Sequence, residues 1–220
     1  MHPPLLPADV LGYSAQYWMA AAGQEKALEY LLAQGADPNQ ADIFGFTPLY
    51  CASTNNHSIV VKMLLRYGAD PNRASMSGHT PLTQAVSLGH KQIALILLEN
   101  SANPSTSSYM LSSPLYIAAE GGHKQIVFSL LEYGADPNYT SIFGYTPLFM
   151  AAKGGYEEIV WLLLEKGADP NINSILGESA LKAAYTNGHI SVSRLLMTRG
   201  AKYVTKSKEA ISNNDSCDIE

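Results

Sequence analysis

The stretch T-P-L-F-M-A-A-K-G-G-Y-E-E-I-V-W-L-L-L-E-K-G-A-D-P-N, residues 146–171, decides the fold of this chain. Thr146 is a residue type that caps a helix with its hydroxyl, and Pro147 suits the first helical turn, where no backbone N–H is needed. The two glycines that follow Lys153 end a helix. These residues predict a first helix over Pro147–Lys153.

A second helix is predicted from about residue 157 to residue 166 by an apolar stripe at helical spacing. The stripe consists of Ile159, Val160, Leu163 and Leu164. Gly167 suits the left-handed backbone conformation just past a helix end, where other residues meet a Cβ clash. The extended segment that follows turns tightly around Leu176 and Gly177. One unit is therefore helix, turn, helix and a projecting, hairpin-like finger.

The same unit recurs every 33 residues along the chain. The tract G-A-D-P-N occupies residues 35–39, 68–72, 134–138 and 167–171, with a divergent copy at 101–105. The tract T-P-L or a close variant begins at Thr47, Thr80, Ser113, Thr146 and Ser179. A fixed period of this length indicates an array of helical units that bury their apolar faces by stacking. Such arrays usually bind other macromolecules, so the period favours binding over catalysis.

The composition restricts the partners and the compartment. The 220 residues include 15% charged side chains and carry a formal net charge of −5. Nucleic acids and anionic membrane surfaces attract clustered basic faces, so neither is the expected partner. The two cysteines, Cys51 and Cys217, lie far apart and have no plausible disulfide partner, which favours a reducing, cytoplasmic compartment. No stretch of the sequence is long and apolar enough to suggest a bilayer span.

The repeat resembles the ankyrin repeat family, whose pattern is roughly D-x-x-G-x-T-P-L-x-x-A-A-x-x-G-H-x-x-I-V-x-x-L-L-x-x-G-A-D-x-N. The resemblance extends over residues 8–203 as six repeats. It implies an all-α solenoid, an ankyrin repeat array of helix-turn-helix units with β-hairpin fingers and a concave binding face. The first and last repeats are expected to act as caps. Residues 1–7 are expected to form a Pro-rich leader and residues 204–220 a disordered tail.

The junction between the third and fourth repeats departs from the family pattern. Its changes are Ser101 for glycine, Asn103 for aspartate, Ser105 for asparagine and Leu111 for the finger glycine. A residue other than glycine in a left-handed conformation costs roughly 1 kcal/mol or more. We expect this finger to take a different shape and this junction to be the weakest. The sequence leaves open whether the change is neutral drift, a hinge or a contact site.

Four histidines occupy one position of the repeat, and histidine is a common metal ligand. They are His57, His90, His123 and His189. Stacked helices lie about 8–10 Å apart, whereas zinc ligands lie about 2 Å from the ion, so equivalent histidines of adjacent repeats cannot share one ion. We expect them to make the Gly-His loop contact that the family resemblance implies, and we expect neither a metal nor another cofactor.

No other group of residues suggests catalysis. Glu120 and Lys153 are repeat-equivalent, and a surface ion pair between them would be worth at most about 1 kcal/mol. Cys51 falls where the family has small or apolar residues, which implies a buried, unreactive thiol. The acids of the G-A-D-P-N tracts suit turn capping, and motifs for phosphate, dinucleotide or zinc-protease chemistry are missing. The sequence therefore predicts a protein that is not an enzyme.

The apolar side chains of the fingers are the candidates for partner contacts. In D-x-x-G-x-T the x positions are usually polar and face solvent, but here most of them are apolar or aromatic. The candidates are Val10, Leu11, Tyr13, Ile43, Phe44, Phe46, Met76, His79, Tyr109, Met110, Ile142, Phe143, Tyr145, Ile175 and Leu176. They predict a continuous apolar stripe, the kind of surface that marks an interface. The alternative is that one residue of each finger packs inward.

Beside the fingers, the concave helical positions are small or weakly polar, from Ala21 and Ala22 to Thr186 and Asn187. They predict a shallow groove, floored by small residues and walled by aromatic ones, that fits a helix or an extended segment of a partner protein. The expected function is that of a monomeric protein–protein interaction module, an adaptor or inhibitor. The alternative is a secreted bacterial effector that captures a host protein through the same face, in the host cytosol.

Overall fold

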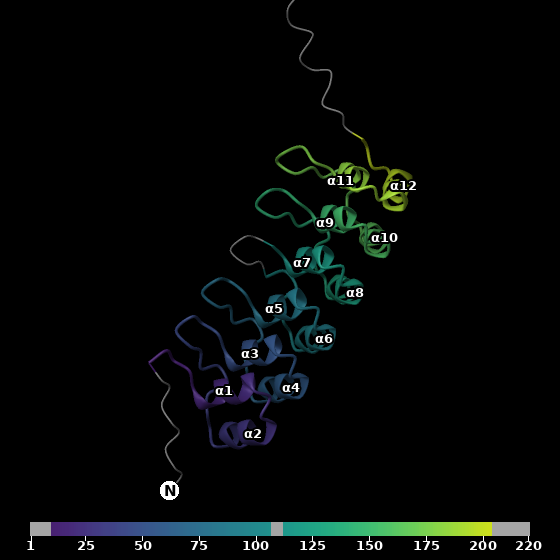
Figure 1. The fold of residues 1–220 in the computed structure, drawn as a ribbon. Helices are drawn as coiled ribbons and strands as arrows, with labels where there is room; N and C mark the ends of the chain where they lie inside the picture. The colour runs from purple at the N-terminus through teal and green to yellow at the C-terminus, as the bar shows by residue number, and fades with distance from the viewer. Residues whose placement is uncertain (1–9, 107–111, 204–220) are drawn as a thin grey trace, which may run out of the picture.

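The computed structural model describes residues 10–106 and 112–203, and these ranges form an array of paired helices (Figure 1). The helices are α1 Ala15–Ala21, α2 Glu25–Ala33, α3 Pro48–Thr54, α4 Ser58–Arg66, α5 Pro81–Ser87, α6 Lys91–Glu99, α7 Pro114–Glu120, α8 Lys124–Glu132, α9 Pro147–Gly154, α10 Glu157–Glu165, α11 Ala180–Thr186 and α12 Ile190–Thr198. Both helices predicted from residues 146–171 are confirmed to within one residue at their ends.

A hydroxyl residue caps the first helix of each repeat. Thr146 Oγ1 accepts a 3.1 Å hydrogen bond from the Phe149 N–H, and Thr47 Oγ1 accepts one of the same length from the Tyr50 N–H. Serine or threonine takes this role in all six repeats. The cap satisfies one of the donors that a first helical turn leaves unpaired, so the predicted N-cap role of Thr146 is confirmed.

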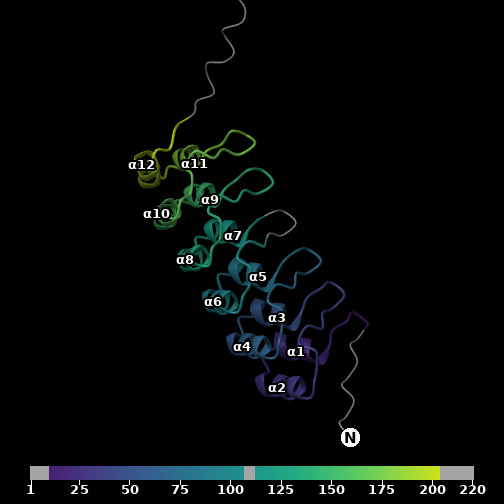
Figure 2. The ribbon, with the colours of Figure 1, turned by 180° about the vertical axis from the view of Figure 1, so that it is seen from behind.

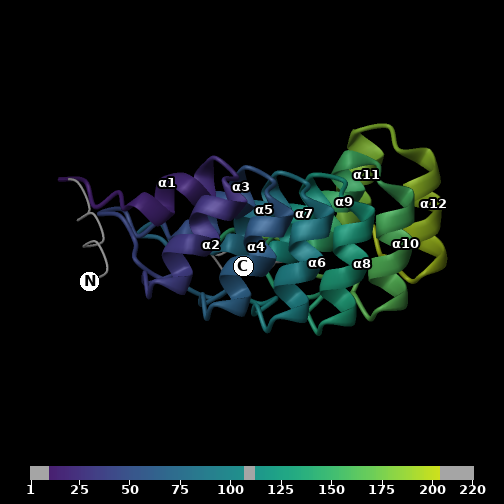
Figure 3. The same ribbon diagram turned by 90° about the horizontal axis from the view of Figure 1, so that it is seen from below.

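The helices stack in two rows. The odd-numbered helices form the row beside the fingers, and the even-numbered helices form the outer row (Figures 2 and 3). Small side chains let neighbouring first helices approach closely, and one fully buried alanine recurs at an equivalent position in five repeats, as Ala52, Ala85, Ala118, Ala151 and Ala184. Each second helix of the central repeats contributes a fully buried leucine, these being Leu64, Leu97, Leu130 and Leu163. The core is therefore continuous, and each repeat is stabilised by its neighbours.

The fingers are tight hairpins, but the described residues contain no strand. In the finger of residues 42–46, the Asp42 N–H donates to the Phe46 carbonyl at 3.1 Å and the Gly45 N–H donates to the Asp42 carbonyl at 3.0 Å. Gly45 has a φ of 81°, which glycine adopts without a Cβ clash. The expected β-hairpin is thus reduced to a β-turn with one closing bond, because the arms are too short for a longer ladder.

Asparagines at the ends of the G-A-D-P-N tracts tie each repeat to the next. Asn138 Nδ2 donates to the Gly167 carbonyl at 3.0 Å, and Asn138 Oδ1 accepts from the Asp169 N–H at 2.8 Å. The same pair of bonds is made by Asn39, Asn72 and Asn171. Each asparagine therefore joins two backbone groups of the following repeat, and this asparagine bracket fixes the register between the two repeats.

The described part of the third-to-fourth junction lacks this asparagine bracket. Ser105 stands at the asparagine position, and its recorded hydrogen bond is a local one from its own N–H to Asn103 Oδ1. Ser101 adopts the left-handed conformation of the glycine it replaces, with a φ of 66°. The finger that was expected to change shape, which includes Leu111, lies outside the described residues. The lower stability of this junction stays a prediction.

The histidine row braces adjacent loops. In three cases Nε2 lies 3.0–3.1 Å from a carbonyl oxygen of the preceding repeat, the pairs being His57 with Ala21, His90 with Thr54 and His189 with Lys153. The fourth ring, His123, lies against the turn glycine Gly89. The structural role predicted for the row is confirmed by these contacts. Across residues 10–106 and 112–203 no group of three potential metal ligands occurs, and no helix there has the length and hydropathy to cross a membrane.

Candidate partner-binding site

The first two variable positions of each described finger carry exposed apolar side chains, with Ser77 as the polar exception. Their exposed fraction ranges from 42% at Leu11 to 97% at Val10. The other exposed members are Ile43, Phe44, Met76, Ile142, Phe143, Ile175 and Leu176. Tyr109 and Met110, which belong to the same predicted set, lie outside the described residues.

Backbone hydrogen bonds set neighbouring fingers side by side (Figure 1). The Ile43 N–H donates to the Leu11 carbonyl at 3.0 Å, and the Met76 N–H donates to the Phe44 carbonyl at 2.9 Å. At the other end of the array, the Ile175 N–H donates to the Phe143 carbonyl at 3.0 Å. The exposed side chains of successive fingers are thereby held next to one another, in one row on each side of residues 107–111.

The third variable position turns inward, which differs from the solvent-facing placement expected from the sequence. Phe46 stacks on Tyr50 with 4.6 Å between ring centroids, and Tyr145 packs on Phe149 at 4.4 Å. Both rings are half-buried, and so are Tyr13 and His79 at the equivalent positions. For the fingers that carry Phe46 and Tyr145, the structure therefore agrees with the alternative in which one residue of the finger packs inward.

A hollow of about 300 Å³ lies where the last two fingers meet the first helices. Its apolar and small lining residues are Tyr116, Tyr145, Phe149, Met150, Ala183, Thr186 and Asn187. Its charged lining residues are Glu120, Lys153, Glu178 and Lys182. This hollow combines the aromatic and small residues that the sequence predicts for the groove, and it adds two charges of each sign.

An ankyrin-repeat sequence profile of three copies matches residues 16–108 and again residues 115–207. The chain belongs to the ankyrin repeat family. A solved ankyrin repeat domain from Acinetobacter baumannii AYE is 30% identical with a TM-score of 0.81, over 85% of this chain and 98% of that one. The ankyrin repeat protein EF0377 is 30% identical with a TM-score of 0.78, over 83% of this chain and 96% of that one.

No curated protein matches the sequence. Ankyrin repeats generally mediate protein–protein interaction, and their fold is typically a binding scaffold without catalysis.

The rim of the hollow in this ankyrin array contains one polar contact between fingers. The Tyr145 hydroxyl donates a 2.9 Å hydrogen bond to Glu178 Oε2. That bond, together with partial desolvation, raises the pKa of Tyr145. Burial raises the pKa of Tyr116, and the nearby Glu120 carboxylate adds to the rise. Both phenols therefore stay neutral at physiological pH.

The ion pair considered between Glu120 and Lys153 is not among those formed by the described residues. Both side chains line the hollow, but neither takes part in an ion pair with another described residue. Glu120 and Lys153 are both exposed to solvent in the ankyrin array.

The thiol of Cys51 is buried, as the sequence predicts, with 6% of the residue exposed. Burial raises its pKa to about 11; the Tyr17 hydroxyl opposes this rise, and the Asp42 carboxylate adds to it. A thiol that stays protonated at neutral pH is a poor nucleophile, so Cys51 is a packing residue. Cys217, the leader of residues 1–7 and the tail of residues 204–220 lie outside the described residues.

A second hollow, on the outer row of helices, was not predicted from the sequence. Its apolar lining residues are Leu95, Phe128, Trp161, Leu162 and Leu195. A signal was present, since Leu95, Phe128 and Trp161 recur at the 33-residue period of the ankyrin repeat. The apolar stripe that predicts each second helix faces the core, and these three positions lie outside that stripe.

Proposed function

We propose that this ankyrin array is a protein-binding module, an adaptor or inhibitor, that holds one partner protein along the finger tips and the concave hollow. The observation that carries the proposal is the row of exposed apolar tips, held side by side by backbone hydrogen bonds. Apolar side chains placed in register over several repeats form a larger patch than isolated surface residues do, and such patches mark interaction surfaces.

The hollow beside the fingers supports the same assignment. Its aromatic rings provide apolar contact area, while the Tyr116 hydroxyl and the charges of Glu120 and Lys153 provide polar contacts at its edge. Interfaces commonly combine an apolar centre with a polar rim. A partner that presents an apolar helix or extended segment to the tips, with polar groups toward the hollow, fits this arrangement.

The test removes exposed tip residues and leaves the inward rings in place. A variant with Ile43, Phe44, Ile142 and Phe143 all changed to Ser should keep its melting temperature within a few degrees, because these side chains are about half exposed. Partners captured by the wild-type chain in affinity purification, identified by mass spectrometry and then purified, should bind this variant at least tenfold more weakly. An affinity equal to that of the wild-type chain would overturn the proposal.

A control variant changes exposed apolar residues on the outer row of helices. Ile59 and Ile190 are 57% and 68% exposed and lie on α4 and α12. Changing both to Ser should leave partner affinity unchanged. The effector alternative shares the finger face and differs in delivery, so deletion of residues 204–220 would block delivery into a host cell without weakening partner binding in solution.

A further inference from the structure

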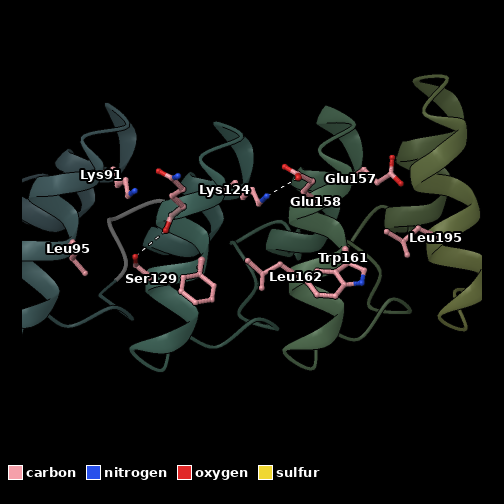
Figure 4. Close-up of a pocket in the computed structure, with 11 residues that line it drawn as sticks. Lys91, Leu95, Lys124, Ser129, Glu157, Glu158, Trp161, Leu162 and Leu195 are labelled. Carbon is pink, nitrogen blue, oxygen red and sulfur yellow. Dashed lines mark hydrogen bonds and ion pairs between the residues drawn. The ribbon is translucent and has the colours of Figure 1, made fainter.

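The outer row of helices carries a hollow of about 890 Å³, which spans α6, α8, α10 and α12 (Figure 4). It lies on the side of the array away from the fingers, since the even-numbered helices form the outer row (Figures 1 and 2). Leu95, Leu162, Trp161 and Leu195 run along it in one line, and charged residues lie along one edge. This outer groove is separate from the finger tips and from the concave hollow.

The centre of the outer groove is a stripe of three large apolar residues at equivalent repeat positions. Leu95, Phe128 and Trp161 are spaced 33 residues apart, and Phe128 and Trp161 are 51% and 49% exposed. The next equivalent positions hold Lys62 on one side and Arg194 on the other, both exposed. The stripe therefore ends after three repeats and is centred on Phe128 of α8. Exposed aromatic residues in such a cluster are typical of an interface.

The charges along the edge are arranged with opposite signs at the two ends. Lys91 begins α6 and Glu157 begins α10, and neither has an ion-pair partner among the described residues. Between them, Lys124 forms a 2.8 Å ion pair with Glu158 (Figure 4). The edge is thus positive over α6, internally neutralised over α8 and negative over α10.

We propose that the outer groove binds a second copy of this chain in a two-fold symmetric dimer. The two-fold axis lies between the two copies, parallel to α8. A two-fold rotation about that axis places α6 of one copy opposite α10 of the other. Phe128 then meets Phe128 of the second copy, and Leu95 meets Trp161. The same rotation sets Lys91 of each copy opposite Glu157 of the other copy, which gives two such pairs.

Over α6, α8 and α10 the surface is self-complementary in both charge and spacing, and this favours a second copy over an unrelated protein. Complementarity ends with these three helices, because the same rotation sets Lys62 opposite Arg194 of the second copy. A two-fold interface requires each group to meet its complement after rotation, and the order of charges from Lys91 to Glu157 satisfies that requirement. The pairing of Lys124 with Glu158 reduces repulsion between the two lysines nearest the axis. Layers of stacked helices lie about 8–10 Å apart, and a second copy matches this spacing because it has the same repeats.

The dimer would leave both finger rows free, on opposite sides of the assembly. One assembly then presents two partner-binding faces, which increases the apparent affinity for a partner with two copies of its site. This proposal departs from the monomer expected from the sequence. It does not depend on the proposed function, because its residues lie on the other row of helices.

The first test measures the mass of the full chain against concentration by sedimentation equilibrium. We expect dimers to accumulate across the micromolar range, and Phe128→Ser to weaken dimerisation at least tenfold. Phe128 is half exposed, so circular dichroism should show an unchanged helical signal for this variant. A chain that stays monomeric up to about 1 mM would overturn the proposal, and so would a dimer that Phe128→Ser leaves intact.

The second test exchanges the two end charges. Lys91→Glu and Glu157→Lys should each weaken the dimer about tenfold, because each turns two attractive contacts into repulsive ones. The double variant restores opposite signs and should return to within about threefold of the wild-type dissociation constant. Lys26→Glu on α2 makes the same change of charge away from the outer groove and should have no effect. A double variant as weak as the single variants would overturn the two-fold pairing.

Discussion

The hydroxyl of Tyr145 donates a 2.9 Å hydrogen bond to Oε2 of Glu178, the residue 33 positions later at the same place in the next finger. The bond joins two neighbouring fingers at the rim of the concave hollow and orients the ring that packs on Phe149. Because a neutral phenol donates to the carboxylate, ionisation of Tyr145 is opposed and its pKa is raised. The contact should therefore depend on pH.

Changing Tyr145 to Phe should lower the free energy of unfolding at neutral pH by about 0.5–1 kcal/mol, since the lost hydrogen bond is partly exposed. The folded pKa of Tyr145 lies above its usual value of 10.0, so this contribution is present below pH 10 and is lost as the pH rises through the folded pKa. Urea unfolding of both proteins at pH 7 and above pH 10 measures the difference. A difference that stays constant across this range would contradict the assignment.

The third-to-fourth junction should be open to stabilisation. Ser101→Gly should raise the free energy of unfolding by about 1 kcal/mol, because Ser101 holds a φ of 66° that glycine adopts at lower cost. Ser105→Asn should add a further increase by supplying the asparagine bracket found at the other tracts. Urea unfolding of the single and double variants measures both effects. Ser101→Ala is the control, since it removes the hydroxyl without relieving the backbone, and it should not stabilise the protein.

The scaffold was predictable because it depends on local chemistry that repeats. Thr146 as a cap and Pro147 in the first turn follow from residue type, and the loop contact of the histidine row follows from the resemblance to the ankyrin family. The structure confirms each of them. Turn capping by the tract aspartates is confirmed as well, with Asp37 Oδ1 accepting from the Asn39 N–H at 2.8 Å. These contacts form within one repeat or between neighbouring repeats that share the same pattern, so a single sequence contains the information that they require.

The direction of individual side chains was not predictable in the same way. All three variable finger positions are apolar in the finger of residues 42–46, and nothing in their composition separates Phe44 from Phe46. The separation arises because Phe46 is close enough to Tyr50 on α3 to stack on it. Trp161 was missed for a related reason, since whether an apolar residue beside a core stripe is covered depends on the neighbouring helix.

The thiol of Cys51 should react slowly in the folded protein. Its pKa rises from 9.0 to about 11, chiefly because it is buried, so little thiolate exists at pH 8. In a Cys217→Ser background, a disulfide reagent such as DTNB should label Cys51 at a rate that increases sharply when urea unfolds the chain. The raised pKa also predicts stability that is fully present below about pH 9 and falls as the pH approaches 11. Fast labelling at pH 8 without denaturant would contradict the burial.

Substitutions at Phe44 and Phe46 should separate the effect on binding from the effect on stability, because the two residues lie in one finger, with ring centroids 6.4 Å apart, and differ in burial. Phe44 is 46% exposed at the tip, so Phe44→Ser should change the free energy of unfolding by less than about 0.5 kcal/mol while weakening partner binding. Phe46 stacks on Tyr50 at 4.6 Å and is half-buried, so Phe46→Ser should cost about 2 kcal/mol, less than the loss of a fully buried ring. Urea unfolding gives the stabilities, and titration with a purified partner gives the affinities. Equal destabilisation by the two substitutions would mean that the tip residue also packs on the array, and the row of finger tips would then be part of the fold instead of a surface kept free for a partner.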